Sequence, residues 1–379
     1  MQEILKGYFS MFFNRQSFFH LRHKNTLSFL DITKYGHEQY QDIIINNVVV
    51  KKASGNHETE TRYKIIQEVL NKYRRPFDIL DIGASQGYFS FRAAYDYDCV
   101  CVMIEGNNQA YPKVGSQLLD LCNANDTLEN IILLNKEVTL KDLLKLGECE
   151  SFSVVLAMNI IHWFGPQWRE ITDAILKLGD NIIIETPPEE DCASQEQNIL
   201  RKSIEEYLLF RKANILGKVP RHTSDNVMAN IYLLESEKKR LTRKHWLVPQ
   251  TSDHYTITSN YEAKTITKWP PHAHTAKVND WKSGINLITF LMYNGAYPSR
   301  EKIEAAVKGI QDPSHNDWTV NNMILQGDRL SLIDWDDPVH GLSGGRRSTP
   351  KVLKTHLRLV GLRHPAKVEN YFWDRLVRS

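Results

Sequence analysis

Two glycines and two acidic residues carry the clearest chemical signal in this sequence: Asp81, Gly83, Gly87 and Glu105. The glycines lie between an apolar run typical of a buried strand and an apolar segment compatible with a helix. A strand, a glycine loop and a helix form the nucleotide-binding unit of doubly wound α/β folds, whose ligands lie at the carboxyl ends of the strands. Glu105 follows the apolar run Cys99–Ile104, at the position where such folds bind a ribose hydroxyl pair. These residues predict a site for a cofactor that contains a nucleoside.

The spacing of the loop narrows the class of cofactor. Asp81-x-Gly83-x-x-x-Gly87 matches neither the dinucleotide pattern G-x-G-x-x-G nor the P-loop with its lysine and Ser/Thr. It resembles motif I of class I S-adenosylmethionine (SAM) methyltransferases, where the loop backbone passes close to the methionine part of the cofactor. A Cβ would block that approach or forbid the backbone angles. A plain turn and a solvated glutamate are the alternatives, but the joint spacing favours SAM bound by Asp81, Gly83, Gly87 and Glu105.

Two further residues are expected near SAM because of the elements that carry them. Arg62 lies on the amphipathic helix predicted over Glu58–Leu70, which leads into the central strand. Its guanidinium is placed to pair with the carboxylate of the methionine moiety, unless it is an ordinary surface arginine. Asn135 ends the predicted strand Ile131–Leu134, where a contact with adenine is expected.

The loop after the predicted strand Phe152–Met158 is expected to face the transferable methyl group. It begins with Asn159, which we assign to the cofactor site, and continues to His162. A histidine here suits a general base because its unperturbed pKa lies near neutrality. Many methyltransferases need no base, so His162 either serves as one or only shapes the pocket.

The remaining elements of the first predicted domain follow from periodicity and turn residues. A strand is expected before the glycine loop over Ile43–Val50, then a fifth strand over Asn181–Pro188 and a long polar helix over Ser194–Arg211. The resemblance to class I methyltransferases implies two closing antiparallel strands, which Ile231–Glu235 and Arg243–Leu247 fit.

A second pattern lies near the C-terminus. His315, Asp317 and Asn322 reproduce the H-x-D-x-x-x-x-N catalytic loop of the kinase fold, and Asp334 follows where a second metal-binding aspartate is expected. The set resembles the aminoglycoside and sugar phosphotransferase branch of that fold. It implies that Asp317 is catalytic and that Asn322 and Asp334 bind Mg²⁺ with ATP, if the lobe is active. Because no glycine-rich loop precedes it, we predict a reduced lobe without phosphoryl transfer.

Together the two units resemble the bifunctional methyltransferase–kinases that terminate bacterial O-antigen polysaccharides. The expected fold is a Rossmann-like α/β methyltransferase domain over residues 56–248, then a small α+β lobe like the kinase C-lobe over 249–379. The resemblance implies a cell-surface polysaccharide, sugar or sugar phosphate as the acceptor. A bifunctional enzyme active on a glycan terminus, a nucleic-acid methyltransferase and a non-catalytic binding protein are the other hypotheses. The last two have less support, and nucleic acid is not an expected partner.

The composition restricts the possible partners and the cellular location of the protein. The formal charge of +2 over 379 residues implies no partner by itself. The five cysteines form no C-x-x-C pair, which favours reduced thiols and a cytoplasmic protein. No apolar run is long enough to cross a bilayer. Residues 1–55 begin with an aromatic and basic segment, and the C-terminal tail is basic. Both segments could contact the inner face of a membrane or a polysaccharide-assembly partner. The alternative is that they pack as ordinary helices.

Overall fold

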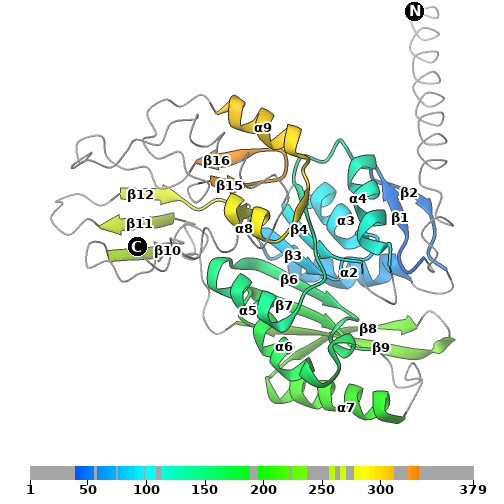
Figure 1. Ribbon diagram of the computed structural model, residues 1–379. Helices are drawn as coiled ribbons and strands as arrows, with labels where there is room; N and C mark the ends of the chain where they lie inside the picture. The colour runs from blue at the N-terminus through cyan, green and yellow to red at the C-terminus, as the bar shows by residue number, and fades with distance from the viewer. Residues whose placement is uncertain are drawn as a thin grey trace, which may run out of the picture.

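An eight-stranded sheet runs through the centre of the computed structural model (Figure 1). The structure describes residues 39–54, 58–73, 76–97, 99–107, 112–187, 195–221, 224–236, 256–260, 265–269, 277–310 and 323–332. Its spatial order is β14-β5-β4-β3-β6-β7-β9-β8. The strands are β3 (Asp78–Ile82), β4 (Val100–Glu105), β5 (Ile131–Asn135), β6 (Phe152–Met158), β7 (Gly179–Glu185), β8 (Asn214–Arg221), β9 (Ser224–Glu235) and β14 (Gly295–Tyr297).

Strands β3 to β7 are parallel, while β14, β9 and β8 each pair antiparallel to their neighbours. The chain runs outward from β3 through β4 to β5, then returns to the other side of β3 with β6 and β7. Ligands of open α/β sheets bind at such a reversal, outside the carboxyl ends of the strands. This order, with its antiparallel closing strand, is the Rossmann-like α/β architecture expected for the methyltransferase domain.

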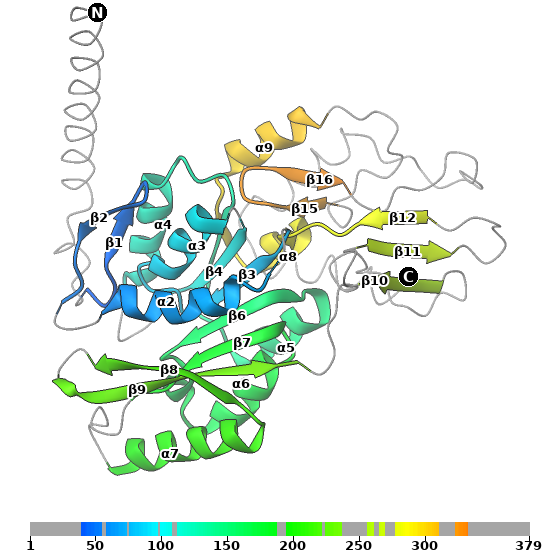
Figure 2. The same ribbon diagram turned by 180° about the vertical axis from the view of Figure 1, so that it is seen from behind.

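Helices cover both faces of the sheet because its central strands are apolar on both sides. Figures 1 and 2 show α2, α3 and α4 on one face, and α5, α6 and α7 on the other. Their bounds are α2 (Thr59–Leu70), α3 (Tyr88–Tyr97), α4 (Val114–Ala124), α5 (Leu140–Cys149), α6 (Trp168–Ile175) and α7 (Gln195–Phe210), and a 3-10 helix, η2 (Ile161–Gln167), precedes α6. Along β3, Leu80 and Ile82 pack toward α5 and α6, whereas Ile79 packs toward α2 and α3.

Two predicted strands differ from the structure. The segment predicted as one strand over Ile43–Val50 is a hairpin of β1 (Ile43–Ile45) and β2 (Val48–Lys51). Asn46 and Asn47 adopt positive φ angles of 49° and 61°, which asparagine tolerates and which a two-residue hairpin turn requires.

The closing strands also differ from the prediction. The partner of β9 is β8, a segment that contains Gly217 and Pro220 and so lacks the usual signature of a strand. The predicted strand Arg243–Leu247 lies outside the described residues.

The chain after residue 280 continues into the same core. It forms β13 (Ile285–Asn286), α8 (Leu287–Met292), β14, α9 (Arg300–Gly309), β15 (Met323–Leu325) and β16 (Leu330–Leu332). Earlier in the chain, β10 (Thr256–Asn260), β11 (Thr265–Trp269) and β12 (Lys277–Asp280) form a separate antiparallel sheet. Strand β14 extends the central sheet beside β5. Two buried carboxylates join this segment to the first unit: Asp78 Oδ2 accepts from Gly284 N at 3.0 Å, and Glu150 Oε1 accepts from Thr289 Oγ1 at 2.6 Å.

Four cysteines lie in the described part of the chain, and all four are buried: Cys99, Cys101, Cys122 and Cys149. Burial raises the pKa of the Cys122 thiol, so it stays protonated. Among the described residues, no helix is both long and apolar enough to cross a membrane.

Candidate functional site

The glycine loop lies at the carboxyl end of β3, at the reversal of strand order. Gly83 has a φ of +73°, which non-glycine residues seldom adopt, and its amide donates to the carbonyl of Ile104 at 2.9 Å. A Cβ added there would lie 2.6 Å from Cγ2 of Ile160. The sequence anticipated the unusual backbone angle. The close neighbour, however, is the loop after β6.

Gly87 has a different role from Gly83. Its φ is +75°, and an added Cβ would meet Leu118 Cδ1 at 2.7 Å and Phe91 Cε2 at 2.8 Å. Both neighbours belong to helices in the core. Gly87 therefore lets α3 begin close to α4.

Glu105 turns its carboxylate toward this loop. Oε2 accepts from the amide of Ser85 at 2.8 Å, and Oε1 accepts from its neighbour Gly106 at 3.0 Å. Burial raises the pKa of Glu105 to about 7, although both backbone hydrogen bonds act to lower it. Each carboxylate oxygen has two lone pairs, so both retain acceptor capacity for a ligand.

Asp81 lies one residue before the end of β3 and is fully buried. Its Oδ2 accepts a hydrogen bond of 2.8 Å from Ser90 Oγ on α3. Burial also raises the pKa of Asp81 to about 7. The structure thus places Asp81 under the loop, where it ties the start of α3 to β3.

Asn135 pairs with Glu105 in the register of β5 and β4, so the two residues are neighbours at the carboxyl edge. Asn294, in the turn between α8 and β14, contacts the Asn135 backbone twice. Asn135 N donates to Asn294 O at 3.2 Å, and Asn294 Nδ2 donates to Asn135 O at 2.7 Å. The wall of the site on this side is therefore held by a residue far along the chain.

Asn159 and His162 follow β6 at the same edge of the sheet. Asn159 has a φ of +57°, and its Nδ2 donates to the Tyr40 hydroxyl at 2.8 Å. Among the described residues, its buried Oδ1 has no hydrogen-bond partner, and neither does the buried Nδ1 of His162. Burial lowers the pKa of His162 to about 4, so the imidazole is neutral at physiological pH.

Arg62 is buried and paired within the protein. Its Nε donates to both carboxylate oxygens of Glu185 at 3.1 Å, and its Nη2 donates to Glu185 Oε1 at 2.9 Å and to Pro220 O at 3.2 Å. Glu185 ends β7, so the pair fastens α2 to the carboxyl edge of the sheet. The pairing of Arg62 with the carboxylate of SAM stays a prediction.

Removal of one member of this pair is expected to destabilise the fold. Arg62→Met leaves the Glu185 carboxylate buried without its guanidinium, a change that typically costs about 3–5 kcal/mol in the free energy of unfolding. Urea denaturation measures the loss. The control is Arg300→Met, because its pair with Glu304 is half-exposed and such pairs contribute at most about 1 kcal/mol. Wild-type stability of Arg62→Met combined with loss of SAM binding would instead assign Arg62 to the cofactor.

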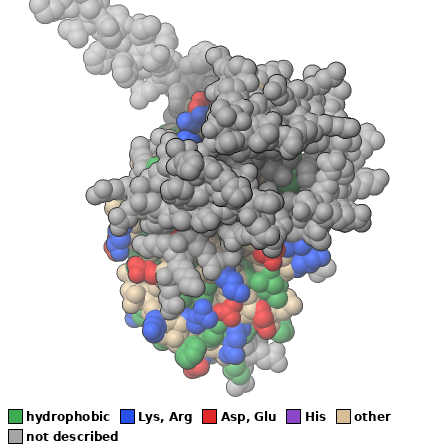
Figure 3. Space-filling model, turned by 90° about the vertical axis from the view of Figure 1, so that its left-hand side faces the viewer, with side chains coloured by type: hydrophobic (Ala, Val, Ile, Leu, Met, Phe, Trp, Pro, Cys, Tyr) green, Lys and Arg blue, Asp and Glu red, His purple; other side chains and the backbone are tan. Residues whose placement is uncertain are grey.

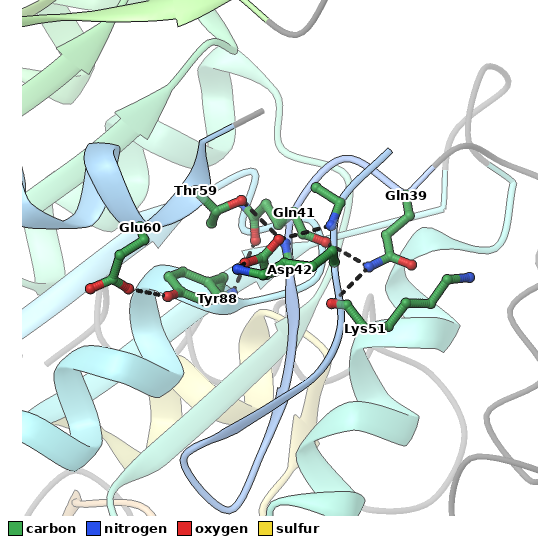
Figure 4. Close-up of polar contacts among 9 residues, drawn as sticks. Gln39, Gln41, Asp42, Lys51, Thr59, Glu60 and Tyr88 are labelled. Carbon is green, nitrogen blue, oxygen red and sulfur yellow. Dashed lines mark hydrogen bonds and ion pairs between the residues drawn. The ribbon is translucent and has the colours of Figure 1, made fainter. Parts of the chain in front are cut away.

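The segment before β1 is a part of the site that the sequence did not reveal. Gln41 N donates to Gln86 Oε1 at 3.0 Å, and Gln41 Oε1 accepts from Tyr88 N at 3.0 Å, so one residue holds both the glycine loop and the start of α3. Figure 4 shows Gln41 and Asp42 beside Tyr88 and the first turn of α2, where Thr59 accepts from the amide of Asp42. Local sequence carries no signal for these contacts, because each depends on chain folding back over the loop.

The residues predicted for the kinase-like lobe, Asp317, Asn322 and Asp334, lie outside the described residues, as does His315. Their roles with Mg²⁺ and ATP stay predictions.

No protein-family model and no curated protein matches this chain. Solved structures with detectable similarity include the bifunctional kinase-methyltransferase WbdD, at 15% identity over 73% of this chain and 75% of that one, with a TM-score of 0.37. The N-terminal domain of EvdMO1, solved with S-adenosylhomocysteine (SAH) and D-fucose, is 12% identical over 55% of this chain and 96% of its own, with a TM-score of 0.38. An O-methyltransferase family protein from Burkholderia thailandensis is 12% identical over 48% and 57%, with a TM-score of 0.35. These similarities are weak, and the fold assignment follows from strand order instead.

Proposed function

We propose that this protein is a SAM-dependent methyltransferase. The observation that carries the proposal is the arrangement at the reversal of strand order. There Glu105, at the end of β4, is hydrogen-bonded to the backbone of the loop that Gly83 begins. An acidic side chain held against a glycine loop suits a ligand with a ribose, and the spacing of the loop favours SAM over a dinucleotide.

The polar groups at the carboxyl edge fit the parts of SAM. The two ribose hydroxyls are donors that match the remaining lone pairs of the Glu105 carboxylate. The methionine ammonium is a donor that matches the orphaned Oδ1 of Asn159, whose loop packs on Gly83 through Ile160. Asn135, next to Glu105 in the sheet, is the proposed neighbour of adenine.

SAM would supply an electrophilic methyl group on a sulfonium. The protein's part is to orient the acceptor and to receive the proton that the acceptor hydroxyl loses. His162 is unprotonated at physiological pH, so it can take that proton, but its pKa of about 4 makes it a weaker base than the unperturbed histidine that the sequence predicted. We assign it this role as a proposal, with shaping of the pocket as the alternative.

For the acceptor we propose a sugar, sugar phosphate or polysaccharide. Nucleic acid is the competing class, and it requires a concentrated positive surface. On the face shown in Figure 3, the described Lys and Arg side chains are interspersed with Asp and Glu. Incubation with labelled SAM and either glycan extracts or RNA would separate the two acceptor classes.

Cofactor affinity is expected to fall as the pH drops below about 7. Ribose hydroxyls donate to the ionised carboxylate, and the Glu105 pKa of about 7 means that this carboxyl is protonated in acid. Binding must then release a proton. The dissociation constant for SAH should therefore rise by up to about tenfold per pH unit below this pKa and be flat above about pH 8. Calorimetry with SAH between pH 5.5 and 8.5 measures this dependence.

Glu105→Gln is the matched control for that titration. It should bind SAH more weakly at pH 8, by about 1.5–3 kcal/mol per lost charge-assisted hydrogen bond, and without the acid dependence. Asp81 also has a pKa of about 7. A dependence that survives in Glu105→Gln would assign the titration to Asp81 and count against the proposed ribose contact.

A further inference from the structure

The loop after β6 exposes a large aromatic side chain beside the proposed reaction centre. Trp163 lies on η2, and its exposed fraction is 62%. Its indole centroid lies 5.2 Å from that of His162, with a tilt of 40°. An exposed indole leaves a large apolar surface in contact with water, which is unfavourable in free energy. A ligand that covers the ring removes this surface from water.

The same loop contains buried polar atoms whose hydrogen-bonding capacity is unmet in the described structure. These are His162 Nδ1 and, three residues earlier, Asn159 Oδ1. A buried polar atom without a hydrogen-bond partner destabilises the folded protein, so such atoms usually mark a ligand or a water site. Asn159 Oδ1 is matched above to the cofactor, which leaves His162 Nδ1 for the acceptor.

Space and charge around Trp163 restrict the chemistry of that acceptor. Gly165 has a φ of +52°, and among the described residues no atom lies within 4 Å of the position that a Cβ would take there, so the backbone is uncrowded at this point of the loop. Residues 159–167 contain no Lys or Arg. The next cation along the chain, Arg169, lies over the rings of Trp168 and Tyr207 at 5.2 Å from each centroid. The loop thus offers the aromatic face of Trp163 and a neutral hydrogen-bond acceptor, the Nδ1 atom of His162. It contains no Lys or Arg side chain of its own that could pair with a phosphate.

We propose that this loop is the acceptor subsite and that it binds a pyranose ring, with the apolar C–H face of the sugar stacked on Trp163 and a hydroxyl donating to His162 Nδ1. Pyranoses combine one apolar face with a rim of hydroxyl donors, and this loop is complementary to both. Trp163 is then the residue that sets acceptor affinity. The inference rests on the proposed methyltransferase function, because the subsite borders the proposed methyl-transfer position.

The test measures binding of simple sugars, separately from binding of the cofactor. The full-length protein, saturated with SAH, is titrated with the methyl glycosides of glucose, galactose, mannose and fucose while tryptophan fluorescence is followed. At least one glycoside should change the emission of wild type, and this change should be absent in Trp163→Phe. By calorimetry, Trp163→Ala should bind that glycoside about three- to tenfold more weakly, while Trp163→Phe, which keeps an aromatic face, should lose less.

Two comparisons keep the outcome interpretable. Phe210→Ala removes another exposed aromatic side chain, at the end of α7 and 79% exposed, and should leave glycoside affinity unchanged. SAH affinity should be equal in wild type and both Trp163 variants. Failure of SAH binding in wild type would reject the cofactor proposal, and the glycoside titration without SAH would still decide the subsite.

Three results would overturn the subsite. One is that none of the four glycosides binds, and another is that Trp163→Ala binds them as wild type does. The third is that a single-stranded oligonucleotide changes Trp163 fluorescence with steep salt dependence while the glycosides do not, which would indicate base stacking on the indole.

Discussion

Removal of the chain from Lys277 onward is expected to yield a protein that no longer folds cooperatively. The deletion takes away β14, which pairs with β5, and it uncovers the core face against which α8 packs. It removes buried apolar side chains, each worth about 1.5–3 kcal/mol of burial; they include Ile285, Leu287, Ile288, Phe290 and Tyr297. It also leaves Asp78 and Glu150 without Gly284 and Thr289 as donors. These losses together exceed the usual stability of a domain.

Solubility, near-ultraviolet circular dichroism and thermal unfolding of the 1–276 protein measure this effect. Asp317→Asn in the full chain is the comparison, since we expect it to leave methyl transfer largely unchanged. The pair of variants separates a structural role of the C-terminal half from a kinase-type role. A 1–276 protein that unfolds cooperatively and binds SAH with full affinity would contradict the prediction.

Replacement of Gly83 by valine is expected to abolish SAH binding. A β-branched residue at a φ of +73° is strained by at least about 1–2 kcal/mol, and its side chain would collide with Ile160. The loop must shift to relieve the strain and the collision, and this shift moves the backbone that is hydrogen-bonded to Glu105 and that we propose faces the cofactor. Calorimetry should show SAH affinity lowered by well over tenfold, that is, by more than about 1.4 kcal/mol.

Gly147→Ala is the matched control for this substitution. Gly147 lies within α5, and a Cβ there would be in ordinary contact with Leu178 at 3.6 Å. We expect unchanged SAH affinity and a gain in stability of up to about 1 kcal/mol, because alanine favours helix. If folded Gly83→Val bound SAH as wild type does, the loop would not be the cofactor site.

Much of the fold is readable from local sequence. The continuous apolar runs that become β3, β4, β5 and β6 indicated buried parallel strands, since only such strands are apolar on both faces. The glycines predicted the loop, and the expectation that a Cβ would block a close approach or forbid the backbone angles agrees with the positive φ of Gly83 and Gly87. The position of Glu105 at the end of its strand followed from the same periodicity. The resemblance to class I methyltransferases added the expectation of two closing antiparallel strands.

Other features were missed for reasons that are physical. The prediction of one strand over Ile43–Val50 is wrong because Asn46 and Asn47, which strands disfavour, turn the chain so that β1 and β2 pair as a hairpin. Strand β8 was missed since its glycine and proline oppose strand formation, and pairing along β9 outweighs that preference. The contribution of Gln41 to the glycine loop had no local signature at all.

Most of the elements, and the residue types at the carboxyl edge of the sheet, can be predicted from the amino-acid sequence, because periodicity, chain order and backbone preference are short-range properties. Tertiary structure alone decided which of those residues meet. It pairs Arg62 with Glu185, 123 positions away, and holds Asn135 by Asn294, 159 positions away. It also brings β14 onto the sheet and leaves Trp163 exposed beside His162. Such contacts form because burial and hydrogen-bond satisfaction are settled over the whole chain, and no window of neighbouring residues contains that information.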